Sequence, residues 1–161
     1  MTIPDKIKSF LLSATDISFG YNEINFIHPD NLHKEQIGYS VDTNGSSLIT
    51  GNDGDWREEW LVIATDQLGD PIIVDVSSSD LTVLSAAHGE GYWEPFVIAN
   101  SLETFKGIVS LLHPISKKRT NPVDLEKHPI TYIERQTALT KIEDQNSDAE
   151  IWFWENFFEN G

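Results

Sequence analysis

Carboxylates crowd the segment from residue 52 to residue 75, and they are the side chains of this chain best suited to chemistry. The segment holds one base, Arg57, and seven acids: Asp53, Asp55, Glu58, Glu59, Asp66, Asp70 and Asp75. A pair of carboxyl groups performs general acid–base catalysis when burial raises the pKa of one of them. Neighbours in a strand point to opposite faces of the sheet, so we do not expect Glu58 and Glu59 to converge.

Asp66 and Asp70 flank a Gly-Asp-Pro turn at residues 69–71. Asp side chains in turns accept hydrogen bonds from nearby backbone N–H groups. We therefore expect these two carboxylates to hold the turn rather than to catalyse a reaction.

The histidines show no metal-binding pattern. No two of them have the His-x-x-x-His spacing of a zinc-binding helix; the five are His28, His33, His88, His113 and His128. Because the chain has no cysteine, it has no thiolate nucleophile, no disulfide and no cysteine-based metal site. We expect neither a metal nor a cofactor.

Serine and glycine motifs of known enzymes are also missing. The serines at 77–79 and 85 do not stand in a Gly-x-Ser-x-Gly setting, and the glycines around Glu90 lack the lysine of a phosphate-binding loop. The sequence therefore predicts that the protein is not an enzyme. A carboxylate- or metal-dependent hydrolase is an alternative, and its carboxylates would have to converge on one point or one metal ion: Asp53, Asp55, Glu58, Asp66 or Glu90.

Composition and charge narrow the class of partner. The 161 residues, of which 39% are hydrophobic, suit a single domain with a real core, spanning residues 1–161. The formal net charge of −15 argues against nucleic acids and anionic membranes, whose phosphates attract lysine and arginine. A basic protein partner, or a charge that only keeps the protein soluble, fits better. With neither an apolar signal segment nor a run of ~18 apolar residues, we expect a cytoplasmic protein.

Hydrophobic periodicity predicts a helix, then a sheet, then more helices. A helix begins near Asp5, with Ile7, Phe10 and Leu11 on one face, and residues 14–34 look irregular. Two short strands at 37–41 and 48–50 are expected around an Asn-Gly turn. Further strands are predicted at 60–65, 72–76, 81–84 and 93–99, and short connections favour antiparallel pairing.

The second half of the chain follows helical periods. Asn100 and Glu103 resemble a capping box, and we expect the helix they open to end at His113 and Pro114. Residues 116–121, with Lys117-Lys118-Arg119, should form a polar linker or tip. Helices are then expected at 122–127, from Thr131 to about residue 145, and from a Ser147 cap onward, so that the C-terminal helices cover residues 122–158.

The last of these helices carries aromatic residues on nearly all of its faces. Ile151, Trp154 and Phe158 mark one face, and other aromatics, including Trp152, lie on the remaining faces. A helix that is apolar nearly all round is buried on several sides or lies at an interface. We expect it to clamp the sheet, and a homodimer contact through this segment is the alternative.

Several short motifs follow one another through the middle of the chain: Gln36-Ile37-Gly38-Tyr39, Gly51-Asn52, Trp60-Leu61-Val62-Ile63-Ala64-Thr65-Asp66, Gly69-Asp70-Pro71-Ile72 and Ile98-Ala99-Asn100-Ser101-Leu102-Glu103-Thr104-Phe105. Taken together and in this order, these motifs resemble the SMI1/KNR4 (SUKH) family. The resemblance covers about residues 30–112, and the C-terminal Phe153-Trp154-Glu155 also fits.

The resemblance implies an α+β fold with a curved, mainly antiparallel sheet flanked by N- and C-terminal helices. Bacterial members of the family are often immunity proteins that neutralise toxins, many of them nucleases, and fungal relatives are tied to cell-wall synthesis. The family has no shared catalytic residues to carry over. Its recurrent positions are structural here: residues 69–71 make the turn, residues 60–64 fill the core, and Asn100 or Ser101 caps a helix.

These observations predict a non-catalytic protein-binding module, most simply an immunity protein that neutralises a basic toxin such as a nuclease. A regulatory or scaffold protein linked to cell-wall synthesis is the alternative. For a basic partner, the acids upstream of the apolar strand are the candidate contact residues: Asp53, Asp55, Glu58 and Glu59.

Overall fold

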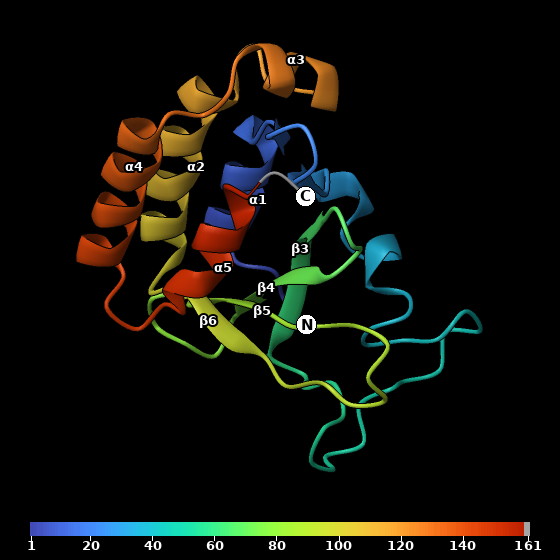
Figure 1. Cartoon of the computed structure of the whole chain (residues 1–161). Coiled ribbons are helices and arrows are strands. Elements are labelled where there is room, and N and C mark those ends of the chain that lie inside the picture. The colour runs from blue at the N-terminus through green and yellow to red at the C-terminus, as the bar shows by residue number, and fades with distance from the viewer. Residues whose placement is uncertain (160–161) are drawn as a thin grey trace.

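Six antiparallel strands form the sheet of this protein, in a computed structural model that describes residues 1–159 (Figure 1). The strands are β1 (Ile17–Ser18), β2 (Glu23–Phe26), β3 (Trp60–Asp66), β4 (Pro71–Asp75), β5 (Val83–Ser85) and β6 (Phe96–Ala99). Each strand pairs with its neighbour in sequence, so the curved sheet is a simple meander. The predicted α+β class and antiparallel sheet are confirmed.

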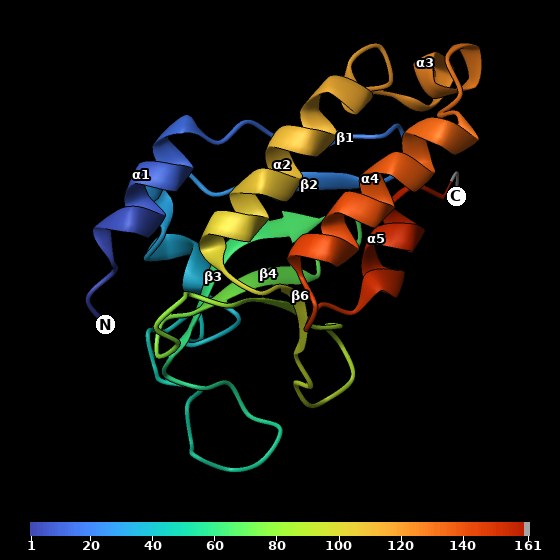
Figure 2. The same cartoon turned by 90° about the vertical axis from the view of Figure 1, so that its left-hand side faces the viewer.

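Helices cover one face of this sheet and loops cover the other. The helices are α1 (Asp5–Ser13), α2 (Leu102–Ser116), α3 (Pro122–Lys127), α4 (Tyr132–Gln145) and α5 (Ile151–Phe157), with two 3-10 turns, η1 (Pro29–Asn31) and η2 (Lys34–Gln36). Figure 2 shows α1, α2, α4 and α5 layered on one side of the strands and the loop that precedes β3 on the opposite side. Within residues 1–159, none of the helices combines the length and the apolar character needed to span a bilayer.

The central strands are buried on both faces, which explains their unbroken apolar sequence. Leu61 and Ile63 of β3 join the main core beneath the helices. Trp60 and Val62 alternate with them and join a second, smaller core beneath the loops.

The loop layer is held by packed aromatic rings rather than by regular structure. Trp56 is 2% exposed, and its indole N–H donates to the Trp60 carbonyl at 3.1 Å. Its ring centroid lies 5.2 Å from that of Tyr39 and 5.1 Å from that of Trp93. The loops from residue 37 to residue 59 are therefore anchored to the sheet although they contain no strand.

The two predicted strands at 37–41 and 48–50 are wrong. Only isolated bridges join Ile37 to Val41 and Val41 to Ser47. Ile37 and Leu48 are exposed, whereas Tyr39 and Ile49 pack against the second core from irregular backbone, so the burial of these segments does not require a strand. The turn itself forms, because the Asp42 carboxylate accepts hydrogen bonds from the N–H groups of residues 44 and 46.

Strands β1 and β2 lie inside residues 14–34, where no regular structure was predicted. β1 has two residues, and β2 has four. Ile24 of β2 is fully buried, but the surrounding Asn, His and Pro residues mask such a short alternation in the sequence.

Three helix ends differ from the prediction. Ser101, not Asn100, caps α2: its hydroxyl accepts from the Thr104 N–H at 3.0 Å, and the Thr104 hydroxyl accepts from the Ser101 N–H at 3.0 Å. α2 also continues through Pro114 to Ser116. The proline removes the hydrogen bond to Ser110, but both residues are exposed, so water can reach the freed carbonyl.

The last helix begins at Ile151 instead of after a Ser147 cap. The Glu150 N–H donates to the Val97 carbonyl of β6 at 2.8 Å, so the chain pairs with the sheet before it can coil. The expected packing of this helix against the sheet is confirmed, since Trp154, Phe157 and Phe158 are buried in the main core.

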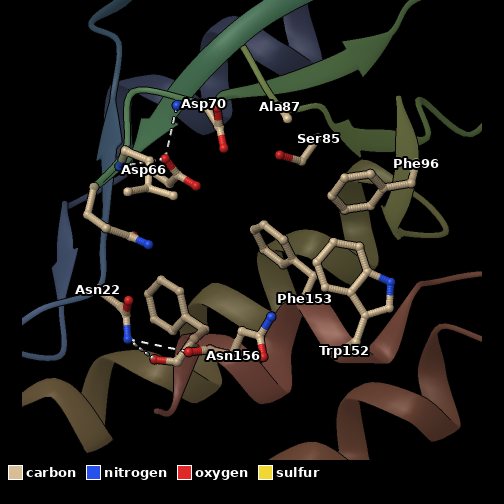
Figure 3. A pocket seen from close by; sticks show the side chains of 12 residues that line it. Asn22, Asp66, Asp70, Ser85, Ala87, Phe96, Trp152, Phe153 and Asn156 are labelled. Carbon is tan, nitrogen blue, oxygen red and sulfur yellow. Dashed lines mark hydrogen bonds between the residues drawn. The ribbon is translucent and has the colours of Figure 1, made fainter. Parts of the chain in front are cut away.

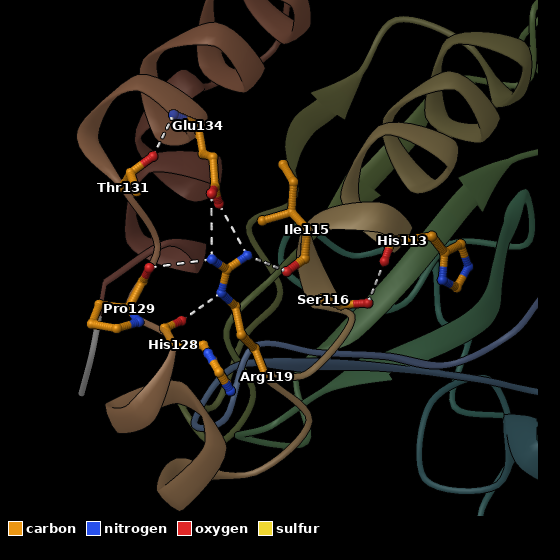
Figure 4. Close-up of polar contacts among 8 residues, drawn as sticks. All are labelled: His113, Ile115, Ser116, Arg119, His128, Pro129, Thr131 and Glu134. Atoms are coloured by element: carbon orange, nitrogen blue, oxygen red, sulfur yellow. Dashed lines mark hydrogen bonds and ion pairs between the residues drawn. The ribbon is translucent and has the colours of Figure 1, made fainter.

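Arg119 does not belong to a solvated tip with the two lysines before it (Figure 4). Its side chain is 13% exposed and forms an ion pair with Glu134 at 3.0 Å. The guanidinium also donates to the carbonyls of Ile115, His128 and Pro129 at 2.8, 2.6 and 3.2 Å. One side chain thus joins the end of α2 to the start of α4, which the sequence alone did not indicate.

Candidate functional site

The four predicted contact acids lie in the loop that leads into β3, on the face of the sheet opposite the helices. Asp53 and Glu58 are exposed, and Asp55 and Glu59 are half-buried. None of the four forms an ion pair with any residue from 1 to 159. The neighbouring base, Arg57, instead lies over the Trp60 ring, 5.8 Å from its centroid.

The four acids are not equivalent. The Asp55 carboxylate accepts a hydrogen bond from the Thr50 hydroxyl, which in turn accepts from the Asn52 N–H at 3.1 Å. Asp55 therefore also holds its own loop, whereas no hydrogen bond within the described chain engages the carboxylates of Asp53, Glu58 or Glu59. Glu58 and Glu59 precede β3 instead of lying within it.

The predicted turn capping by Asp66 is confirmed. One carboxylate oxygen, Oδ1, accepts from the Leu68 N–H at 2.8 Å and from the Asp70 N–H at 2.9 Å. The same prediction is wrong for Asp70, whose carboxylate binds His88 instead of capping the turn. Its Oδ1 accepts from the His88 N–H at 2.9 Å and lies 2.5 Å from the His88 ring nitrogen Nδ1, so Asp70 ties the β3–β4 turn to the loop after β5.

A cleft of about 300 Å³ lies between the β3–β4 turn and α5 (Figure 3). Asp66 and Asp70 lie on one side of it, and the rings of Phe96, Trp152 and Phe153 lie on the other. We call this hollow the turn–helix cleft. The sequence did not reveal it, because its two walls come from segments far apart in the chain.

Large apolar groups at the mouth of the turn–helix cleft are exposed. Trp152 is 44% exposed and Leu68, at the tip of the turn, is 67% exposed. A leucine within a polar turn and a tryptophan off the buried face of a helix were the only sequence signals of this site.

Asn22 fixes the lower wall of the cleft. Its side-chain amide donates to the backbone carbonyls of Phe157 and Glu159 at 3.0 and 2.6 Å and more weakly to that of Asn156 at 3.4 Å. The Phe157 carbonyl is one of the last acceptors of α5, which a helix cannot satisfy internally, and Glu159 follows the end of the helix. The end of the helix is thereby held against the β1–β2 turn.

Two groups near the β3–β4 turn have raised pKa values. Burial, with a smaller contribution from Asp70, raises the pKa of Asp66 above 3.8, against the lowering effect of its backbone hydrogen bonds and of His88. Burial and the carboxylates of Asp70, Glu35 and Asp66 likewise raise the pKa of the Tyr39 hydroxyl above 10.0. Both shifts are those expected where carboxylates lie close together with little solvent.

The carboxylates named for a hydrolase do not gather in one place. Asp66 lines the turn–helix cleft, Glu58 lines a separate hollow beside Gln36 and Trp60, and Asp53 and Glu90 are exposed on loops. Ser85 reaches the cleft, but its hydroxyl donates to the Pro71 carbonyl at 3.1 Å. Across residues 1–159, no three histidine or acidic side chains are arranged to hold a metal ion.

The two surfaces present different chemical groups to a ligand. The loop before β3 presents free carboxylates to solvent, whereas the turn–helix cleft presents carboxylates opposite aromatic rings. Comparison with family models, curated proteins and solved structures finds no match to this chain, so the resemblance to the SMI1/KNR4 family remains a prediction from the motifs alone.

Proposed function

We propose that this protein is a non-catalytic protein-binding module whose partner is a basic protein. The observation that carries the proposal is the segregation of charge. Between residues 35 and 100 Arg57 is the one arginine or lysine, against twelve acids: Glu35, Asp42, Asp53, Asp55, Glu58, Glu59, Asp66, Asp70, Asp75, Asp80, Glu90 and Glu94.

Packing makes the acidic loops a suitable contact surface. The rings of Tyr39, Trp56 and Trp93 hold these loops against the sheet, so less conformational entropy is lost when a partner binds. A surface with one sign of charge also speeds association with an oppositely charged protein.

The motifs that resemble the SMI1/KNR4 family suggest which basic protein this is. They imply an immunity protein, whose partner is a toxin domain. Nuclease toxins carry basic grooves that grip phosphates, and an acidic inhibitor can occupy such a groove. The regulatory or scaffold role linked to cell-wall synthesis would use the same binding surface with a different partner.

The test is co-expression with the basic proteins encoded beside the gene, followed by affinity measurement at two salt concentrations. We expect a complex that weakens as salt rises, and a variant with the four contact acids neutralised to bind about tenfold more weakly, at about 0.3–0.5 kcal/mol for each exposed pair. That variant combines Asp53→Asn, Asp55→Asn, Glu58→Gln and Glu59→Gln.

A matched control removes four exposed charges from the helical layer by combining Glu126→Gln, Glu143→Gln, Asp144→Asn and Glu155→Gln. It should bind as the unchanged protein does, apart from the small effect of net charge. Equal losses in the two variants would show that the loop acids are not the contact surface. A lack of any complex, together with no protection of cells against the neighbouring toxin, would contradict the immunity role.

The hydrolase alternative rests on one observation, the raised pKa of Asp66 in a cleft. Such a group is typical of an acid–base catalyst. If the protein hydrolyses any ester, amide or phosphate substrate and Asp66→Asn abolishes the activity, the proposal of a non-catalytic module is wrong.

A further inference from the structure

We infer that the turn–helix cleft is a binding pocket for a cationic side chain of the partner, and that the guanidinium of an arginine fits it best. This inference rests on the proposed basic partner, and it adds a second contact site on a different edge of the molecule from the loop acids.

The polar wall of the cleft offers acceptors that are not used within the protein. The turn backbone occupies Oδ1 of Asp66, and His88 occupies Oδ1 of Asp70. The Oδ2 atoms of both carboxylates have no hydrogen-bond partner in residues 1–159, and Figure 3 shows the two groups at the edge of the hollow. Two free oxygens on carboxylates already held by the fold can accept bonds without further ordering.

The opposite wall is lined by aromatic rings. The ring centroids of Phe96 and Trp152 lie 4.7 Å apart, and those of Phe96 and Phe153 lie 6.0 Å apart. A guanidinium stacks on such rings and donates N–H bonds to carboxylates in its own plane. Arginine therefore matches both walls, because it is planar, always charged and made only of donors.

Other occupants fit less well. The residues lining the cleft include no lysine or arginine, so an anion would meet only like charge. An apolar group would pack on the rings and on Leu68, but it would also displace water from Asp66 and Asp70 without replacing its hydrogen bonds, which is unfavourable. A second copy of this chain would bring another net charge of −15 to the contact.

Size and desolvation support the same occupant. A volume of about 300 Å³ lies at the lower end of the range for ligand pockets and suits one side chain rather than a cofactor. The Asp66 carboxylate already has a raised pKa because of burial. A bound cation would lower that pKa again, since opposite charges nearby favour the ionised form.

The first experiment uses no partner. The probe is N-acetyl-L-arginine amide, and the control is the citrulline analogue, which has the same shape and no charge. In NMR titrations of the ¹⁵N-labelled protein, we expect saturable shifts of the Leu68 amide and of the Trp152 indole N–H with arginine only. No saturable shift, or equal shifts with citrulline, would overturn the inference.

Variants then locate the site. Asp66→Asn keeps an oxygen that can cap the turn, and we expect it to weaken arginine binding about fivefold or more. Asp144→Asn removes an equal charge from an exposed position on α4 and should leave binding unchanged. Trp152→Leu, at a residue that is largely exposed, should also weaken binding and serves if Asp66→Asn fails to fold. Equal binding by all three variants would contradict the site.

The same variants separate this inference from the proposed function. If the partner binds and neither Asp66→Asn nor Trp152→Leu weakens the complex, the cleft is not a contact site and the proposed function still stands. If arginine amide binds in the cleft but no basic protein forms a complex, the pocket is real and the proposed function is wrong.

Discussion

Gln36 illustrates how one side chain can take the place of a strand. β2 ends at Phe26, which leaves part of one edge of β3 without a neighbour. The Gln36 amide fills this gap: its Nε2–H donates to the Val62 carbonyl at 2.9 Å, and its Oε1 accepts from the Val62 N–H at 2.9 Å. A third hydrogen bond, from Nε2–H to the Leu32 carbonyl at 2.9 Å, fixes the side chain.

We predict that Gln36→Leu destabilises the fold strongly. Leucine is of similar size but leaves the buried N–H and C=O of Val62 without partners, at about 1–3 kcal/mol each. The free energy of unfolding, measured with urea, should fall by about 2–4 kcal/mol. Lys34→Leu, at an exposed position two residues earlier, should change it by about 0.5 kcal/mol or less. Similar losses in both variants would show that the paired amide is not the cause.

Asp66 gives a prediction about pH. Its pKa in the folded protein is raised above the ordinary value of 3.8. At a pH between the pKa of the unfolded state and that of the folded state, the folded state therefore binds more protons than the unfolded state. Stability from this group is therefore fully present below the unfolded pKa and is lost as the pH rises through the folded pKa.

Asp66→Asn removes this titration while its amide oxygen can still accept the two turn hydrogen bonds. The free energy of unfolding of the variant, minus that of the unchanged protein, should increase from about pH 3 to about pH 7. Urea titrations at a series of pH values measure the difference. A difference that decreases over this range would contradict the sign of the shift.

At the scale of elements, α5 combines two roles on its opposite faces. Trp154 is 0% exposed, and its indole N–H donates to the Ile98 carbonyl of β6 at 2.8 Å. Trp152, two residues earlier, points to the turn–helix cleft and stays partly in solvent. The inner face fixes the helix to the sheet, and the outer face forms a wall of the proposed pocket.

We predict that Trp154→Phe destabilises the protein by about 2–3 kcal/mol. The change leaves a buried carbonyl without its donor and a small cavity in the core. Trp152→Phe, which makes the same chemical change at an exposed position, should cost about 0.5 kcal/mol or less. Thermal and urea unfolding of both variants checks the difference. A large loss for Trp152→Phe would mean that this ring belongs to the core.

At the scale of the whole molecule, charge is far from balanced. The chain has 26 acids and 11 lysines and arginines, and in residues 1–159 only Lys106 and Arg119 form ion pairs with acids. Repulsion among the carboxylates is therefore larger than the attraction within these few ion pairs. Such repulsion opposes the compact folded state.

We predict that sodium chloride stabilises the fold. Between about 10 mM and about 100 mM salt the screening length falls from about 30 Å to about 10 Å, and the urea midpoint should rise. The variant with four neutralised loop acids should show a smaller rise because it has less repulsion to screen. A midpoint that falls with salt would mean that attractive pairs dominate the charge interactions.

Local pattern was enough to predict much of the fold. The apolar runs near Trp60 and Ile72 predicted β3 and β4, and the capping of the turn by Asp66 was also predicted correctly. Each of these features depends on a few neighbouring residues. Helix ends were less well predicted, although Asn100 and Ser147 are residue types that cap helices well. The Asn100 side-chain oxygen accepts from the Asp148 N–H instead of capping α2, and the Asn100 backbone N–H donates to the Asn146 side chain.

The sequence by itself determined the α+β class, the buried central strands and the acidic charge, since periodicity and composition act within short stretches of chain. Only the tertiary structure decided that Gln36 completes the edge of β3, that Arg119 joins α2 to α4, and that Asp66 faces Trp152 across a cleft. These relations join residues far apart in sequence, and they depend on how the helices pack onto a twisted sheet, which no local spacing encodes.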